Sequence, residues 1–436
     1  MTRKRKSILA IITSLALAAI MCLTMAFPAF ASTNKPVYAV DEDHPAQAAI
    51  TKMFKMPENT ITPDKTFTFK FEKLSYNNLN SEQDLEFMPV IGEEDKSGDF
   101  GTMSVSFTAA NKGTSENGIK TVWLETDSIF ADIDWEHAGV YSYRVSEIDD
   151  SYARFDETLD CSQASYILTA YVKEHSEGGY YVYAIAAEIE VNDASNEGET
   201  GKVNPTPGGD AQIDGDYSKM IFTNIFVKNN GGTTLDDTVA KISKTVTGDY
   251  ANKDQYFEFE IVMTKPNIGV DTEPVYTAYI CELDELGNVV IVTSEKHTPD
   301  GQDGDNNDIL LFPSGDAPRS VFLKHGQWIA FIDLHVGTHG NVTELAAQNY
   351  TPSYNLTLDG TPILNVPGDE NEPLGFSRYL SDGIVAVSFI NEHQAINPTG
   401  ITVDNLPYIA LIGLALVALV GYLTVKTRKT RAAMSK

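Results

Sequence analysis

Residues 139–147 read GVYSYRVSE, and in this stretch aromatic or apolar residues alternate with polar ones. Successive side chains of a β-strand point to opposite faces, so Tyr141, Tyr143 and Val145 would share one face with Glu147. That face is the one expected to pack into a core, and it ends in a carboxylate. Acidic side chains are almost never buried without compensation. The stretch therefore predicts a core strand that carries a polar site.

Strand patterns of the same kind recur along the chain, whereas no comparably long stretch outside the two ends holds a helical period. Residues 66–71 (TFTFKF), 165–172 (SYILTAYV) and 256–262 (YFEFEIV) alternate or are rich in β-forming residues. Many short strands separated by turn-rich loops predict an all-β protein built from immunoglobulin-like β-sandwiches.

A weak internal repeat indicates two tandem domains of one type. The polar turn-forming cluster at 228–234 (KNNGGTT) is expected to be a linker between residues 48–228 and residues 236–393. Each half opens with x-Thr/Ser-Lys, continues with Phe-x-Phe, carries a late Val-Ser/Thr-Glu and closes with Phe-x-Asn. These elements are Ile50-Thr51-Lys52 and Ile242-Ser243-Lys244, Phe67 with Phe69 and Phe257 with Phe259, Val145-Ser146-Glu147 and Val342-Thr343-Glu344, and Phe222-Thr223-Asn224 and Phe389-Ile390-Asn391.

In each half the alternation directs one Lys, one Glu and one Asn into the core. They are Lys52, Glu147 and Asn224 in the first half, and Lys244, Glu344 and Asn391 in the second. Irregular strand ends, with the Lys reaching solvent and the Asn capping a turn, would explain any one of them. Three residue types recurring in the same order in two halves favour a buried polar site.

The N-terminal 31 residues have the features of a secretory signal peptide. Four basic residues at 3–6 precede an apolar run at 8–26, and the small-x-small sequence Ala29-Phe30-Ala31 follows. An uncleaved N-terminal membrane anchor is the alternative. The cleavage site favours export of the chain.

The C-terminal residues 396–436 combine a short motif, an apolar segment and a basic tail. Residues 408–425 carry no charge and are just long enough to span a bilayer, and Lys426, Arg428, Lys429 and Arg431 follow them. The motif before this segment is Ile396-Asn397-Pro398-Thr399-Gly400. The arrangement resembles a sortase sorting signal of Gram-positive bacteria, in the x-x-Pro-Thr-Gly form found on some pilins, with no residue between Pro398 and Thr399. A plain single-pass membrane protein is the alternative.

The composition excludes one class of partner. The formal net charge is −29, and residues 32–399 alone carry 23 basic and 60 acidic residues, a net charge of −37. Such a body repels phosphate backbones, so we expect no nucleic-acid binding. The acidic stretches 191–218 and 299–308 are expected to be solvated loops. Outside the signal peptide only Cys161 and Cys281 remain, too few for a disulfide framework.

The repeated elements resemble the streptococcal pilin isopeptide-linkage family. The matching stretches are Ile50-Thr51-Lys52, residues 139–147, Ile221-Phe222-Thr223-Asn224, Lys244-Thr245-Val246-Thr247-Gly248 and Phe389-Ile390-Asn391, where Ile390 replaces a common Thr. The resemblance implies that a first-strand Lys and a last-strand Asn form an intramolecular amide assisted by the Glu. Carried over, it gives Lys52–Asn224 with Glu147, and Lys244–Asn391 with Glu344.

Elementary chemistry agrees with this implication. Burial disfavours both the ammonium and the carboxylate, so the Lys would lose its proton and the Glu would keep one. A neutral amine is a nucleophile, and a protonated Glu can polarise the Asn carbonyl and move protons while ammonia leaves. Each domain would react once, on itself and without a cofactor, so we expect no enzyme.

The resemblance also implies a surface protein that sortase assembles. Sortase would cut between Thr399 and Gly400 and pass Thr399 to a Lys of a neighbouring pilin subunit or to peptidoglycan. Lys219, in Tyr217-Ser218-Lys219, stands near the family's linking Lys, although Ser218 replaces the usual Pro, and Lys202 is the rival. The alternative function is a monomeric, wall-anchored adhesin that binds a host ligand. No metal site is expected, since His335 and His339 fall in a Gly-containing loop and Asp300–Asp308 lacks the EF-hand register.

Overall fold

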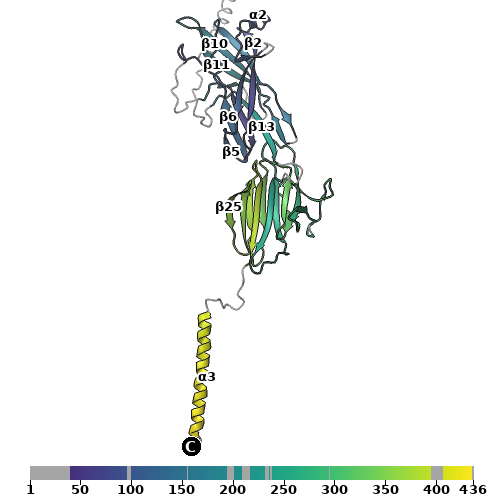
Figure 1. Ribbon diagram of the computed structural model, residues 1–436. Helices are drawn as coiled ribbons and strands as arrows, with labels where there is room; N and C mark the ends of the chain where they lie inside the picture. Colours follow the sequence, from purple (N-terminus) through teal and green to yellow (C-terminus); the bar gives the residue numbers. More distant parts are fainter. Residues whose placement is uncertain are drawn as a thin grey trace, which may run out of the picture.

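The computed structural model describes residues 40–95, 100–154, 156–193, 201–208, 217–230, 235, 238–293, 295–393 and 406–434. The expected signal peptide, residues 1–31, and the sorting motif, residues 396–400, lie outside these ranges. The described residues form two β-rich bodies that follow one another along the molecule, with the C-terminal helix beyond them (Figure 1).

The first body, the first sandwich, consists of two sheets. In spatial order one sheet contains β5 (Thr114–Glu116), β6 (Ile119–Glu125), β1 (Thr51–Pro57), β13 (Ile221–Asn230), β9 (Glu157–Asp160) and β8 (Tyr152–Ala153). The facing sheet contains β12 (Lys202–Val203), β11 (Tyr180–Val191), β10 (Ser165–Glu174), β7 (Gly139–Glu147), β2 (Lys65–Tyr76), β4 (Gly101–Phe107) and β3 (Glu93–Glu94). The short helix α2 (Glu82–Leu85) begins after the N-cap Ser81.

The second body, the second sandwich, is also built from two sheets. The larger contains β18 (Gly301–Gln302), β19 (Asp308–Pro313), β16 (Val275–Leu283), β21 (Trp328–Ile332), β14 (Ala240–Thr247), β27 (Val385–Glu392), β24 (Thr351–Leu358) and β25 (Thr361–Pro367), and β17 (Val289–Ile291) pairs with β16. The smaller contains β20 (Arg319–Leu323), β15 (Phe257–Thr264), β23 (His339–Glu344) and β26 (Leu374–Tyr379).

Alternation along the strands builds a core between the sheets of each body. In β7 the side chains of Tyr141, Tyr143 and Val145 are fully buried, whereas the residues between them are partly exposed. Aromatic rings join the two sheets: Phe54 lies 5.0 Å from Phe67 in the first sandwich. The predicted all-β class is therefore confirmed, and the strands expected at 66–71, 165–172 and 256–262 are β2, β10 and β15.

The first and last strands of each sandwich are parallel neighbours. β1 pairs with β13 in one body and β14 with β27 in the other, both in parallel register. Residues at the two ends of each domain, far apart in sequence, therefore lie side by side in one sheet. This pairing places the Lys and the Asn of each repeat on neighbouring strands in each core.

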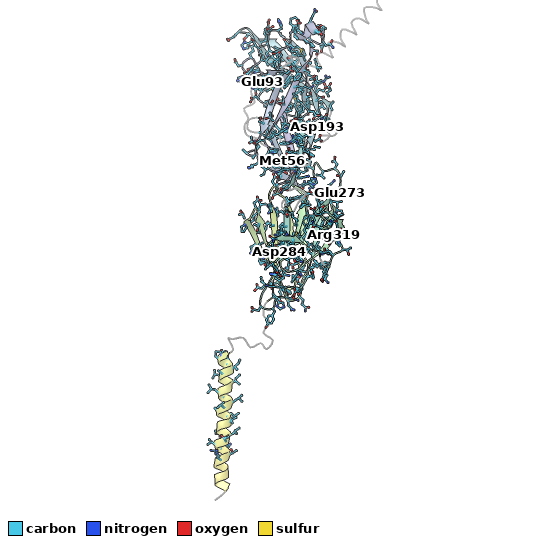
Figure 2. All side chains as sticks on the ribbon, turned by 45° about the vertical axis from the view of Figure 1, so that its right-hand side comes forward. Met56, Glu93, Asp193, Glu273, Asp284 and Arg319 are labelled. Atoms are coloured by element: carbon cyan, nitrogen blue, oxygen red, sulfur yellow. The ribbon has the colours of Figure 1, made fainter. Side chains whose placement is uncertain are left out.

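The two sandwiches meet through the end of β13. Its last residues, Asn229 and Asn230, pair with β22 (Leu334–His335) of the second body. Lys228 forms an ion pair with Asp382 at 2.9 Å. Residues 228–230 of the predicted linker belong to β13, and residues 231–234 lie outside the described residues. Met56, at the end of β1, marks this junction in Figure 2.

Helix α3 (Leu406–Met434) contains the apolar segment expected at 408–425. Residues Pro407–Arg428 are long and apolar enough to cross a membrane. Their side chains are exposed and project on all sides of the helix (Figure 2). An all-round apolar surface of this kind is typical of a helix surrounded by lipid.

Candidate functional site

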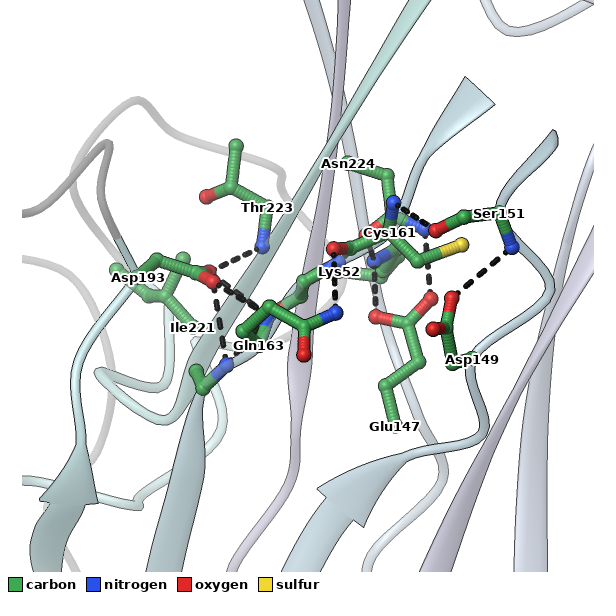
Figure 3. A network of polar contacts seen from close by, with 12 residues as sticks. Lys52, Glu147, Asp149, Ser151, Cys161, Gln163, Asp193, Ile221, Thr223 and Asn224 are labelled. Atoms are coloured by element: carbon green, nitrogen blue, oxygen red, sulfur yellow. Dashed lines mark hydrogen bonds and ion pairs between the residues drawn. The ribbon is translucent and has the colours of Figure 1, made fainter. Parts of the chain in front are cut away.

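The first sandwich buries a contact among Lys52, Glu147 and Asn224 (Figure 3). Lys52 Nζ donates hydrogen bonds to Glu147 Oε2 at 2.5 Å and to Asn224 Oδ1. Asn224 Nδ2 donates to Glu147 Oε1 at 2.6 Å. The side chains of Lys52 and Glu147 are 0% exposed. The three residues predicted from the first half thus form one closed triangle inside the core.

Strand register explains how Lys52 reaches Asn224. In the parallel ladder Lys52 stands opposite Phe222, and Asn224 stands opposite Phe54, two positions further along the same face. Two residues of a strand span about 6.6 Å, a distance that an extended Lys side chain can cover. Glu147 enters from the facing sheet, where it stands opposite Phe69.

The second sandwich repeats this register. Lys244 stands opposite Phe389 and Asn391 opposite Val246, while Glu344 stands opposite Phe259 in the facing sheet. Lys244 Nζ and Asn391 Nδ2 both donate to Glu344 Oε1, each at 2.7 Å. The structure therefore brings the second predicted set together around the carboxylate.

An aromatic ring covers each lysine. Lys52 Nζ lies 4.6 Å from the centroid of the Phe67 ring, and Lys244 Nζ lies 4.3 Å from that of Phe257. These are the first residues of the two Phe-x-Phe elements. The repeat located them by sequence, but their contact with the lysines depends on the packing of the two sheets.

Burial alters the protonation of both pairs. Desolvation lowers the pKa of Lys52 and that of Lys244 to about 8 each, although the neighbouring carboxyl groups oppose the change. Desolvation raises the pKa of Glu147 and that of Glu344, against the attraction of the lysines. A pKa near 8 instead of 10.5 makes the neutral amine roughly 300-fold more abundant at pH 7. Burial therefore shifts both groups toward their neutral forms, the nucleophilic amine and the protonated acid.

Sequence reasoning missed two residues beside the first site. The backbone N–H of Ser162 donates to Asn224 Oδ1 at 2.7 Å, and Ser162 Oγ binds both carboxylate oxygens of Asp193 at 2.8 Å. Asp193 falls in the stretch 191–218 that was expected to be solvated, yet it is only 4% exposed. That expectation is wrong for Asp193, because a carboxylate surrounded by hydrogen-bond donors can be buried.

The two candidate linking lysines lie away from the buried triangle. The backbone N–H of Lys219, just before β13, donates to Asn204, and its Nζ lies 3.9 Å from the Tyr217 ring centroid. Lys202 is exposed on the edge strand β12, opposite Glu188 of β11.

The other residues considered from the sequence have separate surroundings. His335 pairs with Asn229 at the junction, whereas His339 Nε2 is within 2.9 Å of Ser377 Oγ. Asp303, in the acidic stretch 299–308, accepts backbone N–H groups of the turn between β18 and β19. Cys161 and Cys281 are free and buried.

Comparisons with known proteins agree with these features. A family model described as a domain of unknown function (DUF7601) matches residues 240–365. A protein named Pilin from Streptococcus pyogenes serotype M1 is 24% identical over 390 residues, which cover 88% of this chain and 92% of that protein.

Two solved structures are also similar. One is the major pilin from Streptococcus pyogenes, at 19% identity and a TM-score of 0.31, covering 81% of this chain and 100% of that chain. The other is the T3.2 major pilin from S. pyogenes serotype GAS13637, at 16% identity and a TM-score of 0.29, covering 82% of this chain and 100% of that chain. The sequence match over most of the chain confirms the predicted resemblance: this protein is similar to a streptococcal pilin.

Proposed function

We propose that this protein is a pilus shaft subunit that crosslinks itself internally and is then joined covalently to its neighbours by a sortase. The observation that carries the proposal is the buried contact of Lys52 with both Glu147 and Asn224. In the second set Lys244 and Asn391 both contact Glu344. The similarity to a protein named Pilin supports the role of a pilus subunit. The sorting motif and α3 support anchoring at the cell surface.

The proposed internal reaction exchanges one amide for another. Neutral Lys52 Nζ attacks Asn224 Cγ while protonated Glu147 gives the proton on Oε1 to Asn224 Nδ2, 2.6 Å away, and this nitrogen leaves as ammonia. Glu147 Oε2, 2.5 Å from Lys52 Nζ, takes the proton that the amine releases. The new Nζ–Cγ bond replaces the Cγ–Nδ2 bond, and the carboxyl group ends as it began. No oxidant, metal or cofactor is needed.

Intact mass should report both bonds. In the chain that signal cleavage and sorting would leave, residues 32–399, each amide removes one ammonia, so the mass should be roughly 34 Da below that calculated from the sequence. Mass spectrometry of the purified protein measures this difference. An unshifted mass would reject the crosslinks in both sandwiches, and a loss of roughly 17 Da would reject one, which peptide mapping would identify.

The intermolecular link should depend on one lysine. Lys219→Ala should abolish the SDS-resistant ladder of polymers on a cell-wall immunoblot while monomers still reach the wall, because the acyl donor Thr399 is intact and only the acceptor is lost. Lys202→Ala is the matched control and should leave the ladder unchanged. Loss of the ladder in Lys202→Ala alone would transfer the role to Lys202. A single anchored band in the wild type would instead favour the monomeric adhesin.

A further inference from the structure

A short loop after β9 brings a backbone donor to the reacting amide of the first site. β9 pairs antiparallel with β13 as far as Asp160 opposite Ile225, and the ladder ends there. Released from the ladder, the N–H of Ser162 donates to Asn224 Oδ1 at 2.7 Å. The same oxygen accepts a hydrogen bond from Lys52 Nζ. The carbonyl that Lys52 would attack is therefore already held by a fixed donor.

Asp193 fastens this loop to the last strand (Figure 3). Asp193 is buried in the first sandwich. Its carboxylate accepts from Ser162 Oγ at 2.8 Å, from the N–H groups of Gln163 and Ala164 at 3.0 and 3.2 Å, and from the N–H of Thr223 in β13 at 2.8 Å. Since Thr223 precedes Asn224, one buried carboxylate sets the loop and the amide side by side.

In the proposed reaction the Ser162 N–H would stabilise the charge that develops on Asn224 Oδ1. Attack on Asn224 Cγ moves negative charge onto Oδ1. A donor already in place at 2.7–3.1 Å stabilises that charge without reorganisation during the reaction, and removing one such donor typically slows acyl transfer by roughly 100-fold or more.

The second site lacks the equivalent donor. There β24 stays paired with β27 through Pro352 opposite Asn391 and Ser353 opposite Ile390, so no loop leaves the ladder beside the amide. Asn391 Oδ1 is buried and has no hydrogen-bond partner among the residues that the structure describes.

We infer that the Ser162 N–H is an oxyanion donor for the Lys52–Asn224 amide and that Asp193 is its positioning residue, so that the first sandwich crosslinks faster than the second. This inference rests on the proposed crosslinking reaction. It adds a difference in crosslinking rate between two sites that have the same three residue types, Lys, Glu and Asn.

A time course of crosslinking in residues 32–399 tests the inference. The chain is synthesised in a cell-free system, samples are denatured in acid at intervals, and the two amides are quantified by peptide mass spectrometry. In the wild type the Lys52–Asn224 amide should form at least about tenfold faster than the Lys244–Asn391 amide. Equal rates, or a faster second site, would overturn the inference while leaving the crosslinks intact. Absence of both amides would instead reject the proposed function.

Substitution of Asp193 separates positioning from other roles. Asp193→Ala should slow the first amide by roughly 100-fold while the second amide in the same molecule keeps its rate. Asp193→Asn, which retains one acceptor oxygen, should recover part of the rate. Ser162→Ala, which keeps the N–H, should change the rate less than about threefold. The Asp193 charge raises the pKa of both Lys52 and Glu147, and Asp193→Ala and Asp193→Asn both remove that charge. A purely electrostatic role therefore predicts the same rate in the two variants, with no recovery in Asp193→Asn.

The stability of the variants provides the last control. Rates are compared at a temperature where circular dichroism shows each variant folded. If Asp193→Ala and Asp193→Asn form the first amide at the wild-type rate, Asp193 does not position the donor. If both slow the first amide only in proportion to a loss of folded protein, its role is structural and the inference is wrong.

Discussion

Glu147→Ala should leave Lys52 and Asn224 unjoined and lower the free energy of unfolding of the first sandwich by roughly 5 kcal/mol. The carboxyl group contacts both reacting nitrogens, so its removal takes away the route for both proton transfers. The lost amide would have closed a loop of 172 residues. By analogy with a disulfide, closing a loop of that size restricts the unfolded chain by roughly 5 kcal/mol.

The measurement combines intact mass with denaturant unfolding. Glu147→Ala should retain the ammonia of Asn224, so that the mass lies roughly 17 Da above that expected for the doubly crosslinked variant. Asn224→Ala is the matched control, since it also prevents the amide but keeps Glu147 beside Lys52. It should be at least as stable as Glu147→Ala, in which a buried ammonium loses its partner. Glu344→Ala should act in the same way on the second sandwich. Formation of both amides in Glu147→Ala would show that Glu147 is not needed.

Thr399→Ala should remove the polymer from the cell surface entirely. The variant still has a backbone carbonyl at position 399, but it lacks the threonine side chain of the Pro-Thr-Gly motif that the proposed sortase would recognise. The chain is then not cut, and α3 stays attached to the rest of it. Membrane fractions should then contain uncleaved monomer, and the SDS-resistant ladder should be absent from the wall fraction. Fractionation followed by immunoblotting measures both.

Thr402→Ala is the matched control for this experiment. Thr402 stands three residues beyond Thr399, on the side of the proposed cut that sortase discards. Its replacement should leave the ladder unchanged. A normal ladder in Thr399→Ala would mean that the Thr399 side chain is not needed for assembly, and the sorting signal proposed for residues 396–400 would be wrong.

The strands and the three side chains of each buried site were predictable because their signals are local. A period of two decides which residues of 139–147 share a face, and the same rule directs Lys52 and Asn224 inward. Because Lys, Glu and Asn recur in both halves, a buried polar site was a better interpretation than an irregular strand end. Long-range pairing was needed only to bring the members together, through the parallel register of β1 with β13 and of β14 with β27.

Composition did not predict the burial of a charged side chain. The stretch 191–218 is acidic, and the average behaviour of such segments is solvation. Asp193 departs from it because three backbone N–H groups and one hydroxyl meet at its carboxylate. Those donors come from two segments about 60 residues apart in sequence, 162–164 and 223, and no local pattern indicates that they converge. The pairing of β13 with β22 at the junction is hidden for the same reason.

The sequence by itself thus determined the all-β class and the chemical identity of each Lys–Glu–Asn set. It did so because alternation and residue type are properties of single strands. Only the tertiary structure decided that the two sets differ. The Ser162 N–H donates to Asn224 Oδ1, whereas Asn391 Oδ1 has no hydrogen-bond partner among the described residues. Every residue except proline has a backbone N–H, so residue type does not show which N–H will bind a side chain. That depends on where strand pairing stops and on which contacts fix the loop that follows. That is set by contacts between strands distant in sequence.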